Sequence, residues 1–355
     1  MKYHLDYIMI TPSYPPRVGG VERHVFEVHS ALRRSGAKGI IVVANEMPTG
    51  AENSKDTLWF PCRRLFGCLP KTSSLPMSLK LMRIFWKWNP KVIHFHDTII
   101  YPVLPFLSSL GLLKKTYITF HGWEGVCPPM PRVVNRRRKI ASAIKGSIAI
   151  GAFIEKWYGT KSNYISYGGV DVERYGMIKQ SGCDPNELRI GYFGRFEPDT
   201  GLLEVVEAVQ NCNRQLNQKV RLDLYGAGSL RDRLCALNEE EAVVTPLPIA
   251  KDPSAVLAKY SIVIASGYLT ILEALCAERI VFAQYNNELR EDYLRMHPAA
   301  SSIFICKETG DFVAGILRCL SDPAGVAAKS KVGWDWAKRQ SWEKVAATYT
   351  ELWRL

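Results

Sequence analysis

The sequence lacks several patterns that would assign it to a class at once. Its nine cysteines among 355 residues are scattered, with no C-x-x-C pair, so they predict reduced thiols rather than a disulfide framework or a zinc site. The first residues do not resemble a signal peptide, because Lys2, His4 and Asp6 interrupt any apolar stretch. The longest weakly polar run, residues 98–113, contains two prolines and is too short to span a bilayer. We therefore expect a cytoplasmic protein.

Short catalytic signatures are also missing. The sequence contains no nucleophile elbow, P-loop lysine or kinase signature, and its histidines and cysteines do not follow metal-ligand spacing. The net charge of +12 is accompanied by no recognition helix, zinc pattern or aromatic RNA-binding motif. We expect neither a bound metal nor a nucleic-acid partner.

Charge is distributed unevenly along the chain. Residues 1–180 contain 26 Lys and Arg against 11 Asp and Glu, a balance of +15, whereas residues 181–355 have a balance of −3. This asymmetry predicts two domains that face different partners.

Much of the excess positive charge falls in residues 63–91. There the cations alternate with aromatic residues, among them Phe85, Trp86 and Trp88. The candidate contacts to a membrane or an acceptor are Arg63, Arg64, Lys80, Arg83 and Lys87. Such a stretch suits an anionic membrane surface, which would make the protein peripheral on the cytoplasmic face. The alternative is an ordinary helix with a solvated basic face.

Apolar runs alternate with helical patterns from one end of the chain to the other. Strands are predicted at residues 7–11, 39–44, 92–96, 116–120, 146–150, 164–167, 189–193, 220–225, 242–245, 261–265 and 279–283. Helices are predicted at residues 21–35, 78–88, 201–215, 230–237, 255–260, 269–277, 312–320 and 334–355. This alternation predicts an α/β protein with two doubly wound, Rossmann-like domains and a cleft between them. We expect the domains at residues 1–180 and 181–335, with residues 336–355 forming a helix that packs back on the first.

Ligands of doubly wound sheets bind beyond the carboxyl ends of the strands, so the loops there are informative. Gly19 and Gly20 precede a helix, where free N–H groups and the helix dipole favour a phosphate; the alternative is an ordinary turn. Arg195 follows a strand and Gly194, and its planar guanidinium suits a diphosphate. Its alternative is a surface ion pair with Glu197 or Asp199.

A third loop leads into an apolar helix. Its backbone amides are candidates for holding a phosphate, and the residues concerned are Ser266, Gly267, Tyr268, Leu269 and Thr270. Glu273 lies about one turn inside that helix, where a carboxylate is costly to bury without partners. Ribose hydroxyls would satisfy it, and a buried salt bridge is the alternative.

These loops together resemble the family 4 glycosyltransferases, retaining enzymes with the two-domain GT-B fold. The resemblance covers nearly the whole chain: residues 19–24, Ile93-His94-Phe95-His96-Asp97, His121-Gly122, Gly168-Gly169-Val170-Asp171, Gly194-Arg195-Phe196, Leu272-Glu273-Ala274-Leu275 and the C-terminal helix with Ser341-Trp342. It implies a metal-independent hexosyltransferase of glycan biosynthesis without a cofactor. The donor would be a UDP- or GDP-sugar and the acceptor a glycan, a lipid-linked molecule or an envelope component.

The same resemblance implies roles for particular residues. Gly19 and Gly20 would approach the donor phosphates, and Arg195 would neutralise the departing diphosphate. Glu273 would hold the ribose hydroxyls, and His121 would lie beside the transferred sugar. His121 and Arg195 are therefore the candidate catalytic residues.

The sequence departs from the family pattern at two places. Thr200 stands where the family usually has a lysine, and Ala265 stands where it usually has a first glutamate that touches the sugar. Two alternatives to a glycosyltransferase therefore remain: a non-catalytic relative that binds nucleotide-sugars, and a nucleotide-sugar epimerase on the same fold.

Overall fold

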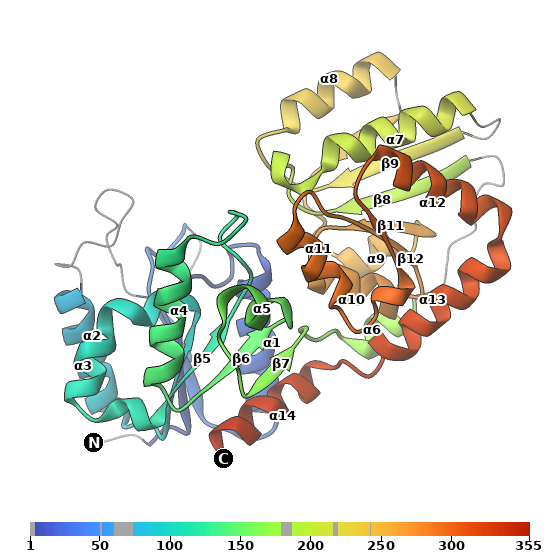
Figure 1. Ribbon diagram of the computed structural model, residues 1–355. Coiled ribbons are helices and arrows are strands. Elements are labelled where there is room, and N and C mark those ends of the chain that lie inside the picture. Colours follow the sequence, from blue (N-terminus) through green and yellow to red (C-terminus); the bar gives the residue numbers. More distant parts are fainter. Residues whose placement is uncertain (1–3, 50–51, 60–73, 179–186, 216–218, 242) are drawn as a thin grey trace. The chain divides into compact units, whose positions relative to one another are not determined.

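The computed structural model describes residues 4–49, 52–59, 74–178, 187–215, 219–241 and 243–355. The chain divides into two compact units (Figure 1). The first unit comprises Met1–Ser166 and Trp342–Leu355, and the second comprises Tyr167–Ser341. The chain therefore passes from the first unit to the second after Ser166 and returns to the first after Ser341. The domain boundaries expected from the sequence were after residue 180 and after residue 335.

The first unit is built on a seven-stranded parallel sheet. Its strands are β1 (Tyr7–Thr11), β2 (Gly39–Val43), β3 (Thr57–Trp59), β4 (Val92–His96), β5 (Thr116–Phe120), β6 (Gly146–Ile150) and β7 (Tyr164–Ser166). They lie in the order β3-β2-β1-β4-β5-β6-β7. Strands β4 and β5 are neighbours in which His96 pairs with Thr119, so the loops after these two strands emerge side by side.

Helices cover this sheet, and the last of them comes from the end of the chain. They are α1 (Gly20–Arg34), α2 (Ser74–Trp88), η2 (Asp97–Val103), α3 (Leu104–Ser109), η3 (Leu112–Lys115), α4 (Pro131–Ala143), α5 (Phe153–Tyr158) and α14 (Trp342–Trp353). Val25, Val28 and Leu32 form the fully buried stripe of α1, as their helical spacing requires. Helix α14 packs on the rest of the first unit through buried aromatic rings. The ring centroids of Trp353 and Tyr7, for example, lie 5.2 Å apart.

The second unit is built on a six-stranded parallel sheet. Its strands are β8 (Glu187–Phe193), β9 (Lys219–Tyr225), β10 (Val244–Leu247), β11 (Ile262–Ala265), β12 (Ile280–Gln284) and β13 (Ile303–Cys306), in the order β10-β9-β8-β11-β12-β13. Its helices are α6 (Val172–Gly176), η4 (Pro198–Thr200), α7 (Leu202–Gln215), α8 (Arg231–Glu241), α9 (Pro253–Leu257), α10 (Tyr268–Cys276), α11 (Glu288–Arg295), η5 (Ala300–Ser302), α12 (Thr309–Ser321) and α13 (Pro323–Ala337). Both units are therefore Rossmann-like α/β folds, which confirms the predicted fold class.

The expected single helix at residues 334–355 is wrong. The chain instead forms α13 and α14, separated by residues 338–341. Val170 pairs with Ser341 in a parallel bridge, and the Val170 N–H donates to the Gln340 carbonyl at 2.9 Å. That pairing requires extended backbone at Ser341, which a continuous helix does not allow.

The remaining differences concern short or unusual elements. Strands β3 and β13, of three and four residues, were not predicted. Helix α4 was not predicted because its run of cations hides the apolar period. Strand β10 runs past Pro246, which lacks a backbone N–H; β10 is an edge strand, where a proline is tolerated.

Candidate active site

Two loops of the second unit meet where neighbouring strands end. Strands β8 and β11 pair with Phe193 opposite Ala265, so Gly194-Arg195 and Ser266-Gly267 leave the sheet side by side. A Cβ atom on Gly194 would collide with Ser266 Oγ, which explains the glycine at this crossing. The structure thus brings together Arg195 and the start of α10, two candidate donor-binding features.

Arg195 lies on the surface of this edge. Its side chain is 65% exposed and forms an ion pair with Asp199 at 2.8 Å, one of the two alternatives considered from the sequence. The Tyr192 hydroxyl donates to the Arg195 carbonyl at 2.8 Å and so fixes the backbone below the guanidinium. An exposed pair of this kind contributes little to stability, about 0–1 kcal/mol, so a phosphate could replace Asp199 at small cost.

The first turn of α10 already uses one of its amides. The Tyr268 N–H donates to the Tyr293 hydroxyl at 2.7 Å, and the Tyr268 hydroxyl donates to the Tyr293 carbonyl at 2.6 Å. The two rings stack with centroids 3.8 Å apart. Of the predicted amide donors, Tyr268 is therefore paired within the protein, while Ser266, Gly267, Leu269 and Thr270 are only half-buried.

Glu273 lies in the second turn of α10 and is 5% exposed. Burial, with the nearby carboxylates of Asp171 and Glu273, raises the pKa of the Cys276 thiol to about 11. A carboxylate in this position needs hydrogen-bond or charged partners, and Glu273 has an interaction of its own within the protein.

The two positions that depart from the family pattern lie at the same edge. Ala265 ends β11 and is 1% exposed. Thr200 Oγ1 donates to the Glu197 carbonyl at 2.6 Å, and a Cβ atom on the following Gly201 would collide with the amide of Gln284. Both hydrogen-bonding atoms of the buried Gln284 amide lack a partner among the described residues. Gln284, at the end of β12, is a polar group of this edge that the sequence analysis missed.

The loop with Gly226 and Gly228 is structural. A Cβ atom on Gly226 would collide with the Gly194 carbonyl, and one on Gly228 with the Phe196 carbonyl. Phe196 N–H donates to the Ala227 carbonyl at 2.9 Å. These glycines let the two loops pack backbone against backbone.

In the first unit, the predicted phosphate loop is occupied by a side chain. Gly19 caps α1 with extended backbone, and a Cβ atom on it would collide with the Glu22 carboxylate. Gly20 has open space at the same position. The negative group at the N-terminus of α1 is therefore Glu22, which would have to move for a phosphate to approach Gly19.

His121 lies just after β5 and is 8% exposed. Its backbone N–H donates to Asp97 Oδ1 at 2.9 Å. Asp97 has a left-handed backbone with φ of 58°, and burial raises the pKa of its carboxyl group to about 7. The residue after β4 therefore holds the residue after β5, as the neighbouring strands predict.

The loop that follows His121 is clamped by Arg137, which the sequence analysis missed. Arg137 is 2% exposed, and its Nη2 donates to Glu124 Oε1 at 2.7 Å and to the Gly122 carbonyl at 3.2 Å. Its guanidinium lies 3.9 Å from the Tyr158 ring centroid, and the Tyr158 hydroxyl donates to Glu124 Oε2. The basic run of α4 offered no signal that one of its arginines points inward.

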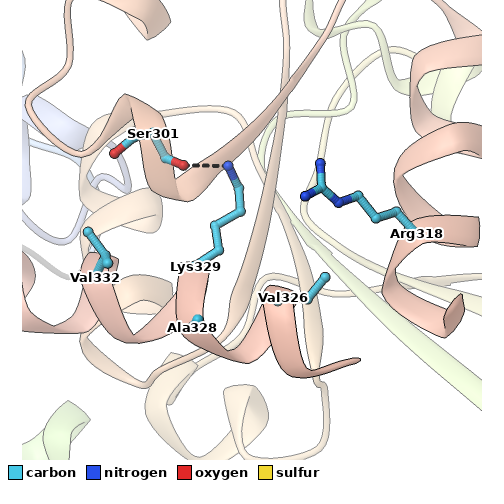
Figure 2. Close-up of a pocket in the computed structure, with 7 residues that line it drawn as sticks. Ser301, Arg318, Val326, Ala328, Lys329 and Val332 are labelled. Carbon is cyan, nitrogen blue, oxygen red and sulfur yellow. Dashed lines mark hydrogen bonds between the residues drawn. The ribbon is translucent and has the colours of Figure 1, made fainter. Parts of the chain in front are cut away.

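A shallow pocket of about 370 Å³ lies elsewhere in the second unit, between α12 and α13. Figure 2 shows Lys329 bonded to the Ser301 carbonyl, with the Arg318 guanidinium across the pocket from it. Ser301 lies in η5, the short helix that leads into β13, so this pocket lies where that strand begins. It contains none of the predicted site residues.

In the described part of the chain, no group of three or more His, Cys, Asp or Glu side chains could hold a metal ion. No helix in those same ranges is long and apolar enough to cross a membrane.

Part of the first half of the chain matches a known family model. Residues 18–174 match the model of Glycosyltransferase Family 4. No curated protein matches the sequence.

Several solved structures share the fold over the whole chain. A sucrose-phosphate synthase from Thermosynechococcus elongatus has a TM-score of 0.75 at 16% identity, covering 98% of both chains. A glycosyltransferase from Rickettsia africae has a TM-score of 0.76 at 16% identity, covering 99% of this chain and 98% of that one. Anabaena HepE, in complex with UDP and glucose, has a TM-score of 0.71 at 16% identity, covering 98% and 99%. Residues 18–174 therefore resemble glycosyltransferase family 4, and the chain shares the fold of these solved structures over nearly its whole length.

Proposed function

We propose that this protein is a retaining glycosyltransferase that takes a sugar from a nucleotide-sugar and works without a metal ion. The observation that supports this most directly is the edge of the second unit where β8 and β11 end side by side. There an exposed guanidinium, half-buried helix amides and a buried carboxylate lie within one small region. These are the groups that a diphosphate and a ribose require.

Each group has a specific task in this proposal. Arg195 would exchange Asp199 for the donor diphosphate. The backbone amides of Gly267, Leu269 and Thr270 would also bind the diphosphate and help to stabilise its negative charge. Glu273 would accept hydrogen bonds from the ribose hydroxyls. Structures with the same fold support the ligand class, since HepE holds UDP and glucose and Arabidopsis starch synthase IV holds ADP and acarbose.

The reaction would break the bond between the anomeric carbon of the sugar and a diphosphate oxygen. A new bond would form from that carbon to the acceptor oxygen on the same face of the sugar, and the acceptor proton would pass to the departing diphosphate. Positive charge and helix dipoles stabilise the leaving group without a metal. The contacts of the donor with His121, Gly19 and Gly20 remain predictions from the sequence. The Glu22 carboxylate beside Gly19 would have to move before a donor phosphate could approach.

A non-catalytic nucleotide-sugar-binding protein is the second candidate. It is favoured by Ala265, whose buried methyl group stands where the family usually has a carboxylate at the sugar. Gln284 is the nearby polar group that could take over a sugar hydroxyl, because its amide has no partner among the described residues.

A panel of UDP-, GDP- and ADP-sugars decides between the candidates. Isothermal titration would identify the donor, and product analysis with glycan and lipid-linked acceptors would follow. We expect binding of one nucleotide class and release of the nucleoside diphosphate only when an acceptor is present. Binding without turnover on any acceptor would favour the non-catalytic candidate, and failure of every nucleotide to bind would contradict both.

We further propose that α2 brings the protein to an anionic membrane, where a lipid-linked acceptor would lie. Its buried side, with Leu81 and Phe85, packs inward, while Trp86 is 74% exposed. The same helix contains the cations Lys80, Arg83 and Lys87, and Arg63 and Arg64 lie outside the described residues. Exposed apolar and basic side chains on one helix are typical of interfacial binding.

Vesicle sedimentation tests this docking. The wild type should bind anionic vesicles, with affinity that falls steeply as salt rises, and neutral vesicles little. Replacing Lys80, Arg83 and Lys87 with Glu should abolish binding, whereas the same change at Arg132, Lys139 and Lys145 in the first unit should weaken it only slightly. Equal binding to neutral vesicles, or no binding at all, would indicate a soluble acceptor.

A further inference from the structure

Four buried histidines lie together in the first unit, and the proposed reaction uses only one of them. His24 comes from α1, His94 and His96 from β4, and His121 from the loop after β5. Ring centroids are 4.9 Å apart for His24 and His121, 5.1 Å for His94 and His96, and 5.3 Å for His96 and His121. Burial lowers the pKa of all four imidazoles. Each ring is therefore neutral at pH 7, with one N–H donor and one acceptor nitrogen.

The tautomer of His94 follows from a residue of the C-terminal helix. The indole N–H of Trp353 donates to His94 Nδ1 at 3.0 Å, and an indole nitrogen can only donate. His94 therefore accepts at Nδ1 and has its proton on Nε2. From there it donates to Thr119 Oγ1, which lies 2.8 Å away.

The next two bonds follow from the number of protons available. Thr119 Oγ1 lies 2.7 Å from the Tyr349 hydroxyl, which lies 2.8 Å from His24 Nε2. If Thr119 donates to Tyr349 and Tyr349 donates to His24, both hydroxyl protons have an acceptor. The opposite direction leaves the Thr119 proton without an acceptor within the described ranges, which buried groups avoid. His24 therefore accepts at Nε2 and has its proton on Nδ1.

His96 sets the tautomer of His121. His96 Nδ1 lies 3.0 Å from His121 Nε2, and His96 Nε2 is buried with no partner in the part of the chain that the structure describes. A proton on that Nε2 would be an unpaired buried N–H, which is rarer than an unpaired buried acceptor. The proton of His96 is therefore on Nδ1, where it is donated to His121.

We propose that His96 is a positioning residue that fixes His121 as a neutral hydrogen-bond donor with its single proton on Nδ1. In the same cluster, Trp353 and Tyr349 of α14 set the tautomers of His94 and His24. Nε2 of His121 is occupied by His96, so Nδ1 is the ring nitrogen left for a substrate. It offers a proton and not a lone pair.

The consequence for the reaction rests on the proposed function. His121 would donate a hydrogen bond to a hydroxyl oxygen of the transferred sugar. It would not remove the acceptor proton, because a base needs the lone pair that this tautomer lacks. The proton must then go to the diphosphate of the donor, which agrees with transfer on one face of the sugar.

Histidine ring ¹⁵N NMR of the full chain tests the tautomers without any substrate. In protein labelled at its seven histidines, two-bond ¹⁵N–¹H correlations should show Nδ1–H for His24, His96 and His121 and Nε2–H for His94. His297 of the second unit supplies a reference, because its Nδ1 accepts the Ala299 N–H at 3.2 Å and its proton must be on Nε2. A proton on Nε2 of His121, or a charged ring, at pH 7 would overturn the proposal.

Two variants of His96 separate positioning from packing. The side-chain amide of His96→Asn places a donor nitrogen near the former Nδ1, whereas His96→Leu removes the donor. We expect the Asn variant to keep Nδ1–H on His121, and the Leu variant to lose it and to lower kcat by about tenfold with KM for the donor little changed. An unchanged His121 signal in a folded Leu variant would contradict the proposal. If no nucleotide-sugar binds the wild type, the proposed function fails, while the ring signals still decide the tautomer.

Discussion

The polar groups at the strand ends of the two units are held in opposite ways. In the first unit His121 is paired on both its backbone N–H and its ring, through Asp97 and His96. In the second unit Arg195 is largely exposed with one weak partner, and the Gln284 amide has none among the described residues. The first edge is preorganised by the protein, whereas the second has polar groups that a ligand would complete.

The reason for this difference lies in what covers each edge. Helix α14 brings Tyr349 and Trp353 into the first unit, so the histidines are surrounded by donors and acceptors of fixed direction. The corresponding region of the second unit is covered by the loops that its own glycines allow to pack together. A preorganised group can act in chemistry, while an exposed, weakly paired group can change partner when a ligand binds.

The largest difference between the units should appear in their response to acid. Burial lowers the pKa of five histidines in the first unit, His29 to about 4 among them, but of only His297 among the described residues of the second. Below pH 6.5 the unfolded chain takes up protons that the folded unit does not, so stability is lost as pH falls. The raised pKa of Asp97 acts in the opposite direction between about pH 7 and pH 4.

Because five histidines of the first unit are held neutral against one in the second, with Asp97 offsetting part of the effect, the first unit should lose several times more of its free energy of unfolding than the second between pH 6 and 5. Hydrogen exchange measured peptide by peptide at pH 7, 6 and 5, corrected for intrinsic rates, would separate the two. Protection should fall first in β4 and β5 and last in β8 and β11. Equal loss of protection in both units would contradict the assignment of neutral histidines.

The next largest effect concerns the exposed guanidinium of the second unit. Arg195→Ala should lower donor affinity by roughly 30- to 100-fold, because a charge-assisted contact contributes about 2–3 kcal/mol. Stability should hardly change, since the ion pair with Asp199 is exposed. Arg233→Ala, an exposed arginine of α8, is the matched control.

Glu273→Gln should weaken nucleoside binding and leave free pyrophosphate binding nearly intact. Glu278→Gln, exposed just beyond the far end of the same helix, should change neither. Isothermal titration with the nucleoside diphosphate and with pyrophosphate measures both. Unchanged donor affinity in folded Arg195→Ala and Glu273→Gln would remove the site from this edge.

The sequence was sufficient to predict the parts of this comparison that depend on local pattern. Apolar runs located β1, β4, β5 and β6 at their observed bounds, since a buried parallel strand is continuously apolar. Because parallel strands end at the same edge, the loops of Arg195 and Ser266 could be placed in one region before the structure was known.

The sequence could not predict contacts made across long separations. Tyr349 lies 325 residues from His24, and Tyr293 lies 25 residues from the Tyr268 amide that it caps. Arg137 looks like any other cation of α4 until its buried position is known. Nothing in the sequence indicated that the Glu22 carboxylate lies at the glycine assigned to a phosphate. Each of these depends on the direction of a side chain, which residue type and spacing do not fix.

A smaller effect should follow from removing one hydroxyl of the histidine cluster. Tyr349→Phe leaves His24 Nε2 and the Thr119 proton without their partner, at a cost of about 1–3 kcal/mol of the free energy of unfolding of the first unit. Tyr101→Phe, at a tyrosine that is 36% exposed, should cost little. Urea unfolding of the full chain measures both, and a cost for Tyr349→Phe no larger than that for Tyr101→Phe would show that the bonded chain does not stabilise the first unit.

The smallest effect concerns the outer surface of the first unit. Arg83 is exposed on α2 beside Trp86, and one cation near an anionic surface contributes about 1 kcal/mol. Arg83→Gln should therefore weaken binding to anionic vesicles by roughly fivefold, with the difference disappearing at high salt because exposed charges are screened. Arg132→Gln removes the same charge from a different helix of the same unit, α4, and should have less effect. If the two variants weaken binding equally, net charge alone attracts the protein to the membrane, and α2 is not the surface that docks.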